Sequence, residues 1–167
     1  SSDVCSSDLS AFIDLPDGTM PQGTSKYEKR GIAFKVPVWD SSKCLQCNMC
    51  SYVCPHAVIR PFLLNAEEAA NAPEGFQMTD AKGKGLEGLK YSIQVATLDC
   101  TGCGSCVNCC PAKEKAISMQ PFDQHKAEAE HFEYAIQQPV KNPLGVSTVK
   151  GSQFHQPLLE FPGACPG

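Results

Sequence analysis

Two cysteine runs with the same spacing dominate this sequence. The first reads C-x2-C-x2-C-x3-C-P over residues 44–55, and the same spacing recurs over residues 100–111. Together the runs hold nine of the eleven cysteines. Two-residue gaps let a tightly turning loop direct three successive sulfurs at one small inorganic body, while a fourth ligand has to come from elsewhere. We therefore expect each run to supply three thiolates to an iron–sulfur cluster.

The fourth cysteine of each run links the two halves of the sequence. In proteins with two [4Fe–4S] clusters and this spacing, that cysteine ligates the cluster of the other run. The assignment is Cys44, Cys47, Cys50 and Cys110 for the first cluster, and Cys100, Cys103, Cys106 and Cys54 for the second. The exchange predicts one domain built around both clusters rather than two separate domains.

Other uses of the cysteines fit the spacing less well. A structural zinc site uses C-x2-C pairs and requires neither the third cysteine nor the Cys-Pro that ends each run. A disulfide framework suits short secreted chains, and the adjacent Cys109 and Cys110 make its geometry awkward. Cys109 falls outside the repeated spacing. We expect it to be a thiol near a cluster, with replacement of Cys110 as a ligand as the alternative.

Charge and hydropathy exclude several functions. The formal net charge is −4, and each oxidised cluster with its four thiolates adds about −2. Such an acidic chain is not expected to bind nucleic acid, whose phosphates require a basic surface. No apolar run approaches the roughly 20 residues of a membrane span, and no signal-peptide pattern is present. Thiolate ligands and the lack of targeting signals indicate a reducing cytoplasm.

The expected fold class is α+β, a bacterial two-[4Fe–4S] ferredoxin-like domain with irregular flanks. Residues 1–10, rich in Ser and Asp and containing Cys5, are expected to be a non-native or disordered tail. Residues 11–40 are expected to be an interdomain linker segment, 41–121 the cluster domain, and 122–167 a helix followed by a linker. The first cysteines of the runs are 56 positions apart (100 − 44), so we expect an insertion over about 61–89.

Local patterns predict short elements around the runs. Residues 32–39 are extended but contain Pro37, which restricts them to an edge strand. Further strands are expected at 56–61, ended by Pro61, at 91–96 and at 115–119. Asn65 is expected to cap a helix over 66–71, and Asp123 a helix that reaches about Gln137.

Further motifs flank the cysteine runs. They are DGT at 17–19, KRGIA at 29–33, VPVW at 36–39, KCLQCNMC at 43–50, PHAVIRP at 55–61, DCTGCG at 99–104, VKGSQF at 149–154 and QPLLEF at 156–161. These segments resemble the ferredoxin-type domain of pyruvate:ferredoxin (flavodoxin) oxidoreductases. The resemblance covers about residues 11–167.

The resemblance implies that the chain is a fragment of a much longer enzyme. That enzyme converts pyruvate and coenzyme A to acetyl-CoA and CO2 on thiamine diphosphate with Mg, and is expected to be a homodimer. Electrons leave through three [4Fe–4S] clusters to ferredoxin or flavodoxin. Cys165, in GAC at 163–165, resembles the first ligand of the third cluster. Pro166 departs from the small residue that the resemblance predicts after it.

The expected function of these residues is therefore to relay electrons rather than to catalyse the chemistry of pyruvate, since no catalytic grouping is present. Alternatives are a free-standing two-cluster ferredoxin, the same domain in another 2-oxoacid:ferredoxin oxidoreductase, and a zinc-stabilised module.

Overall fold

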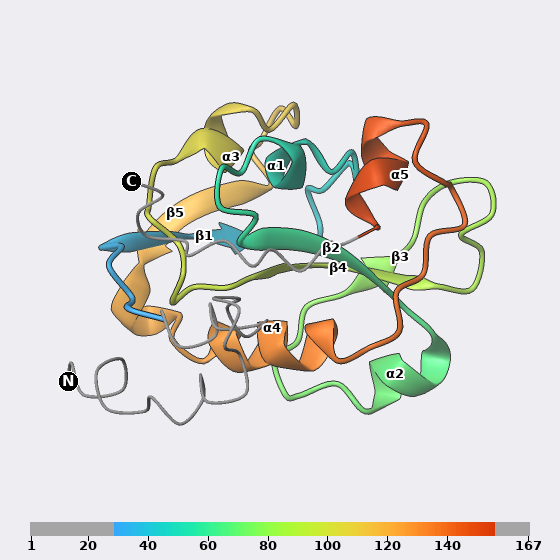
Figure 1. Ribbon diagram of the computed structural model, residues 1–167, viewed down its shortest axis with the longest axis horizontal. Helices are drawn as coiled ribbons and strands as arrows, with labels where there is room; N and C mark the ends of the chain where they lie inside the picture. Colours follow the sequence, from blue (N-terminus) through green and yellow to red (C-terminus); the bar gives the residue numbers. More distant parts are fainter. Residues whose placement is uncertain (1–28, 156–167) are drawn as a thin grey trace, which may run out of the picture.

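The computed structural model describes residues 29–155 and shows an α+β arrangement of short elements (Figure 1). In chain order they are β1 (Lys35–Trp39), α1 (Met49–Tyr52), β2 (Ile59–Leu64), α2 (Ala66–Ala70), β3 (Thr79–Asp80), β4 (Lys90–Val95), α3 (Ser105–Asn108), β5 (Ile117–Pro121), a 3-10 turn (Phe122–Gln124), α4 (Glu128–Ile136) and α5 (Val149–Gln153).

The strands pair across the two cysteine runs. β1, which precedes the first run, pairs antiparallel with β5, which follows the second run. β2, which follows the first run, pairs antiparallel with β4, which precedes the second run, and β3 adds to the far side of β4. Each run therefore starts and ends on strands that are hydrogen-bonded to the strands of the other run. This pairing holds α1 and α3 together on one side of the strands, with α4 on the other side (Figure 1).

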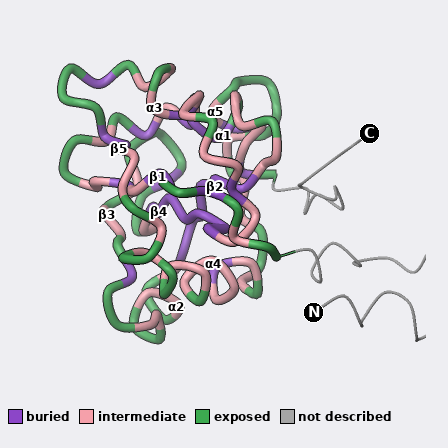
Figure 2. The backbone as a smooth tube through the Cα atoms, turned by 90° about the vertical axis from the view of Figure 1, so that its left-hand side faces the viewer, coloured by how far each residue is buried: buried purple, intermediate pink, exposed green. Residues whose placement is uncertain are grey.

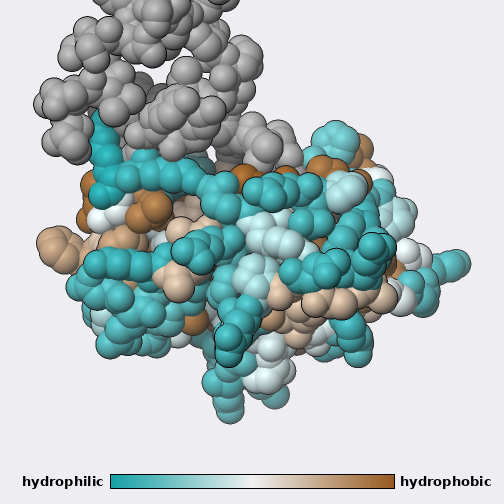
Figure 3. Space-filling model, turned by 90° about the horizontal axis from the view of Figure 1, so that it is seen from below, coloured by the Kyte–Doolittle hydropathy of each residue, from teal (hydrophilic) through white to brown (hydrophobic). Residues whose placement is uncertain are grey.

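The strands at the centre of the molecule form its core. All six residues of β2 and five of the six in β4 are buried, and Figure 2 shows buried backbone concentrated in these strands. Ile59, Tyr91 and Ile93 belong to one apolar cluster with the ligand candidates Cys50 and Cys106. The opposite side, around α4, presents a largely hydrophilic surface with small separate apolar areas (Figure 3). The strands are therefore buried between the cysteine loops and α4.

Several local expectations are confirmed. The strands expected at 91–96 and 115–119 correspond to β4 and β5. β1 is half of a two-stranded sheet, so Pro37 lies on an edge strand, opposite Met119. Asn65 caps α2 in a capping box, in which Asn65 Oδ1 accepts from the Glu68 N–H and a Glu68 carboxylate oxygen accepts from the Asn65 N–H, both at 2.8 Å.

Two expectations about boundaries are wrong. β2 does not end at Pro61 but continues to Leu64, with Pro61 opposite Ile93. Because β2 is the edge strand of its sheet, the ladder tolerates the missing N–H donor. The helix expected from Phe122 is interrupted: a 3-10 turn covers Phe122–Gln124, and α4 begins only at Glu128. Asp123 is not an N-cap but pairs with Lys126 on the surface.

The C-terminal region also differs from the linker that we expected. Up to His155 it includes α5, which is capped by Thr148 and packs against α1. Phe154 at the end of α5 is 1% exposed. Among the helices of residues 29–155, none combines the length and apolar character that a membrane span requires.

Candidate metal centre

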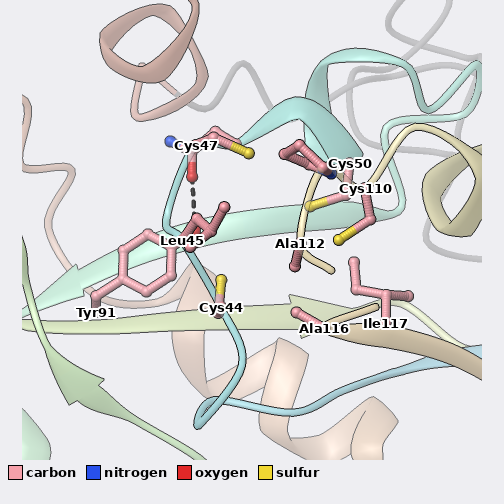
Figure 4. A pocket seen from close by; sticks show the side chains of 11 residues that line it. Cys44, Leu45, Cys47, Cys50, Tyr91, Cys110, Ala112, Ala116 and Ile117 are labelled. Carbon is pink, nitrogen blue, oxygen red and sulfur yellow. Dashed lines mark hydrogen bonds between the residues drawn. The ribbon is translucent and has the colours of Figure 1, made fainter. Parts of the chain in front are cut away.

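Four cysteine side chains surround one pocket beside α1. Cys44, Cys47 and Cys50 come from the first run, and Cys110 comes from the second. The pocket has a volume of about 320 Å³, counting the part that opens to solvent. Figure 4 shows the four sulfur atoms around a common space, with Ala112 and Ile117 closing one side.

A second pocket has the complementary composition. Cys100, Cys103 and Cys106 come from the second run, and Cys54 from the first. This pocket has a volume of about 340 Å³, again including space open to solvent. β5 contributes to the walls of both pockets, with Ile117 on the first and Met119 on the second. The eight cysteines singled out in the sequence are thus brought together as two sets of three plus one.

The two loops direct equivalent backbone groups at sulfur. The Gln46 N–H points at Cys44 Sγ at 3.3 Å, and the Gly102 N–H at Cys100 Sγ at 3.4 Å. These residues occupy the same position in the repeated spacing and both have positive φ, 55° and 72°. Such N–H groups stabilise negative charge on sulfur, as the thiolate ligands of a cluster require.

Burial makes these thiols hard to ionise without a bound cation. It raises the pKa of Cys50, where the neighbouring Cys44 adds to the effect. It also raises the pKa of Cys106, to about 12, with Cys54 as the next cause. Four thiolates at such a site need compensating positive charge, which an iron–sulfur core supplies. Cys103, the most exposed of the set, has a lowered pKa because the Ser105 hydroxyl and N–H bond to its sulfur.

The described side chains do not converge on a site for a single metal ion. Within residues 29–155, no three His, Cys, Asp or Glu side chains converge closely enough to hold one metal ion. The four sulfurs of a tetrahedral zinc site, with Zn–S of about 2.3 Å, would lie only about 3.8 Å apart. Here the four cysteines of each set line one pocket without such a convergence on a single ion. The donor sets are all thiol, as cubane clusters prefer.

Among the described cysteines, Cys109 does not join either set. Cys109 lines neither pocket; its thiol donates to the Cys106 carbonyl at 3.3 Å. Cys5 and Cys165 lie outside the described residues. Asn48 and Tyr91 also line the first pocket, and neither was expected there from the sequence. The only sequence signal for Asn48 was an amide at a position where the second run has Gly104.

Comparisons with known proteins match the segment that contains both cysteine runs to a [4Fe–4S] domain. Residues 40–114 match the family described as 4Fe-4S dicluster domain, and residues 8–33 match a domain of unknown function. The pyruvate-flavodoxin oxidoreductase of Enterobacter agglomerans is 54% identical over 160 residues, which are 95% of this chain and 14% of that protein. The pyruvate:ferredoxin oxidoreductase of Moorella thermoacetica is 56% identical over 154 residues, 91% of this chain and 13% of the relative.

A third relative carries the same segment in a longer protein. The pyruvate dehydrogenase [NADP(+)] of Cryptosporidium parvum is 52% identical over 155 residues, 91% of this chain and 8% of the relative. The chain thus spans about one seventh or less of the length of these relatives. Their similarity covers nearly all of the chain, including the segment with two [4Fe–4S] clusters. The chain is therefore a member of the pyruvate:ferredoxin and pyruvate-flavodoxin oxidoreductase family, corresponding to one segment that contains its 4Fe-4S dicluster domain.

Proposed function

We propose that this chain holds its two [4Fe–4S] clusters in the two four-cysteine pockets and passes electrons between them. The first cluster takes Cys44, Cys47, Cys50 and Cys110 as ligands, and the second takes Cys100, Cys103, Cys106 and Cys54. The observation that carries the proposal is the exchange of the fourth cysteine: each pocket has three cysteines of one run and one of the other. The clusters supply one-electron chemistry. The protein ligates them, limits their contact with water and stabilises their charge with N–H groups.

The residues between the pockets suit electron transfer from one to the other. Cys50 and Cys106, one from each set, belong to the same apolar cluster as Ile117. The two pockets are therefore connected through one apolar cluster. The N–H groups of Gln46 and Gly102 stabilise the added negative charge of the reduced state.

The function of the whole protein follows from the relatives as a proposal. We infer that the chain belongs to an enzyme that oxidises pyruvate with coenzyme A to acetyl-CoA and CO2, using thiamine diphosphate, Mg and a third cluster. Cys165 is the proposed first ligand of that third cluster. The relatives' names support pyruvate as the substrate and flavodoxin or ferredoxin as the electron acceptor. A homodimeric parent in a reducing cytoplasm remains part of this proposal.

The domain boundaries are also part of the proposal. We place the cluster domain at 41–121 and treat 61–89 as an insertion relative to a minimal two-cluster ferredoxin. The support is that this segment adds the second part of β2, α2 and β3 between the two cysteine runs.

Metal analysis and single-cysteine variants test the ligand assignment. The anaerobically purified chain should contain about eight iron and eight sulfide per molecule, and its reduced form should give two interacting EPR signals. Cys110→Ala should lose the first cluster and keep the second, whereas Cys109→Ala should keep both. Stoichiometric zinc without sulfide would exclude the clusters. Loss of the first cluster in Cys109→Ala but not in Cys110→Ala would reverse the assignment of these neighbours.

A further inference from the structure

The first cysteine loop has two buried amide side chains where the second loop has glycine. Gln46 and Asn48 occupy the positions of Gly102 and Gly104 in the repeated spacing. All four residues have positive φ, 55°, 62°, 72° and 76° respectively. Glycine adopts this conformation without strain, glutamine adopts it at a cost, and asparagine tolerates it better than other residues with a Cβ. The first loop therefore accepts a cost that glycine would avoid, which indicates that its two side chains contribute something in return.

Gln46 joins the first loop to the turn between β3 and β4. Its side chain is 0% exposed. Nε2 donates to the Asp80 carbonyl at 2.8 Å, and Oε1 accepts from the Lys82 N–H at 2.7 Å. The amide thus pairs with the backbone of residues 80–82 as a neighbouring strand would. The loop that carries Cys44 is fixed to a segment more than thirty residues away.

Asn48 joins the same loop to β4 and α5. It is 1% exposed. Its Nδ2 donates to the Lys150 carbonyl at 2.8 Å, and its Oδ1 accepts from the Tyr91 hydroxyl at 2.6 Å. One turn further on, the Ser51 hydroxyl donates to Gln153 Oε1 at 2.7 Å. The first loop is therefore held by β4 and by a helix about one hundred residues away.

The second loop has no counterpart to these two amides. A Cβ added at Gly104 would have no atom within 4 Å, and the nearest atoms to one at Gly102 belong to Ala33 and Lys35, with the Lys35 carbonyl at 3.1 Å. Its central ligand candidate, Cys103, is exposed and bonds to the nearby Ser105. The two loops share their backbone path but differ in how the rest of the fold holds them.

We propose that Gln46 and Asn48 are positioning residues for the first cluster and not for the second. By fixing the loop to β4, α5 and the turn at 80–82, they keep the Gln46 N–H directed at Cys44 Sγ and keep water away from the pocket. N–H···S bonds and solvent exclusion set the potential of a cluster and its resistance to loss. The inference rests on the ligand assignment proposed above.

Glycine variants of the first loop test this role directly. Gln46→Gly and Asn48→Gly give the first loop the residues of the second, so the backbone path stays accessible and only side-chain bonds are lost. In the cluster-loaded chain, iron release to a chelator and the midpoint potential of each EPR signal are measured. Cys47→Ala and Cys103→Ala, each lacking one ligand, identify the two signals.

The expected effect is confined to one cluster. We expect the first cluster of either glycine variant to be lost on the order of tenfold faster, since two buried hydrogen bonds disappear. Its midpoint potential should become more negative, because a loosened N–H···S bond stabilises the added negative charge of the reduced state less well. The second cluster should keep its rate and potential. Asn71→Gly, which removes an exposed amide at the end of α2, is the matched control and should change neither cluster.

A variant in α5 tests the same contact from the other side. A Cβ at Gly151 would lie 2.2 Å from the Gly145 carbonyl, so Gly151→Ala must push apart α5, which carries the Lys150 carbonyl, and the facing turn at Gly145. It should speed loss of the first cluster although it touches no cysteine. In the double variant with Asn48→Gly, the rate of loss of the first cluster should rise by less than the product of the two single increases. Both substitutions disturb the same contact, between Asn48 and the Lys150 carbonyl. Tyr91→Phe, which removes only the hydroxyl bond, gives a milder variant that preserves the core.

The outcomes separate this inference from the ligand assignment. A wild-type chain without about eight iron and eight sulfide contradicts the proposed function itself. If the wild-type chain holds both clusters, two results would overturn the role of Gln46 and Asn48. The glycine variants would lose the two clusters equally fast, or they would lose neither faster than wild type does. The role is also overturned if the double variant Gly151→Ala with Asn48→Gly loses the first cluster at a rate raised by the full product of the two single increases. Gly104→Asn is the reciprocal variant. If it changes the second cluster as strongly as Asn48→Gly changes the first, an amide at this position acts without the partners of Asn48, and the proposed role of those partners is wrong.

Discussion

Replacing Phe154 with alanine tests whether α5 is an integral part of the cluster domain. The Phe154 side chain is 1% exposed, and its ring packs edge-on against Tyr91, with centroids 6.1 Å apart at an angle of 89°. Tyr91 in turn packs edge-on against Trp39, at 5.9 Å. Phe154 is therefore the apolar anchor that attaches α5 to the core beside the first pocket.

The magnitude follows from the buried area. A phenylalanine buries roughly 150–250 Å², which at about 25 cal/mol per Å² corresponds to about 4–6 kcal/mol as an upper bound. Measured Phe→Ala substitutions in cores cost about 3–5 kcal/mol. We therefore expect Phe154→Ala to destabilise the docked state of α5 by about 3 kcal/mol, a factor of about 150 in the docking equilibrium.

Hydrogen exchange followed by mass spectrometry measures this equilibrium locally. In wild type, the α5 amides, including the Ser152 N–H bonded to the Thr148 carbonyl, should be protected. In Phe154→Ala they should exchange about a hundredfold faster or reach the rate of an unstructured peptide. Val149→Ala, on the same helix but at a residue 39% exposed, is the control and should change protection only slightly. Rapid exchange of α5 in wild type, or unchanged protection in Phe154→Ala, would show that α5 is not anchored in this way.

Three further predictions concern other parts of the fold. Gly102→Ala should destabilise the second cysteine loop by about 1–2 kcal/mol or more, because φ is 72° and the new Cβ would lie 3.1 Å from the Lys35 carbonyl. The variant should therefore lose the second cluster to a chelator faster than wild type does. Equally fast loss of both clusters would contradict this. Asn65→Ala should remove the capping box and reduce α2 protection by about 1 kcal/mol in hydrogen exchange, without affecting α5. Lys90 lowers the pKa of Asp80. The stabilisation from this pair is therefore present above the ordinary Asp pKa and is lost as the pH falls through the lowered pKa. Carbon-detected NMR should show that Lys90→Met raises the Asp80 pKa, and an unchanged pKa would rule the pairing out.

The strand pairing explains why so much of the site was predictable. The repeated spacing of the runs is local, and each run is followed by a strand, β2 after the first and β5 after the second. Once β2 pairs with β4 and β1 with β5, the fourth cysteine of each run is carried to the pocket of the other. Capping of α2 by Asn65 was likewise predictable, because its partner Glu68 is three residues away.

The sequence by itself therefore determined the two sets of cysteines and most strands, since these depend on spacing and on neighbours close in the chain. Only the tertiary structure decided that β2 runs through Pro61, because this depends on β2 being an edge strand. It also decided that α5 docks beside the first pocket and that Asn48 bonds to Lys150. These contacts join residues about one hundred positions apart, and no periodicity in the chain encodes which distant backbone carbonyl a buried amide will meet.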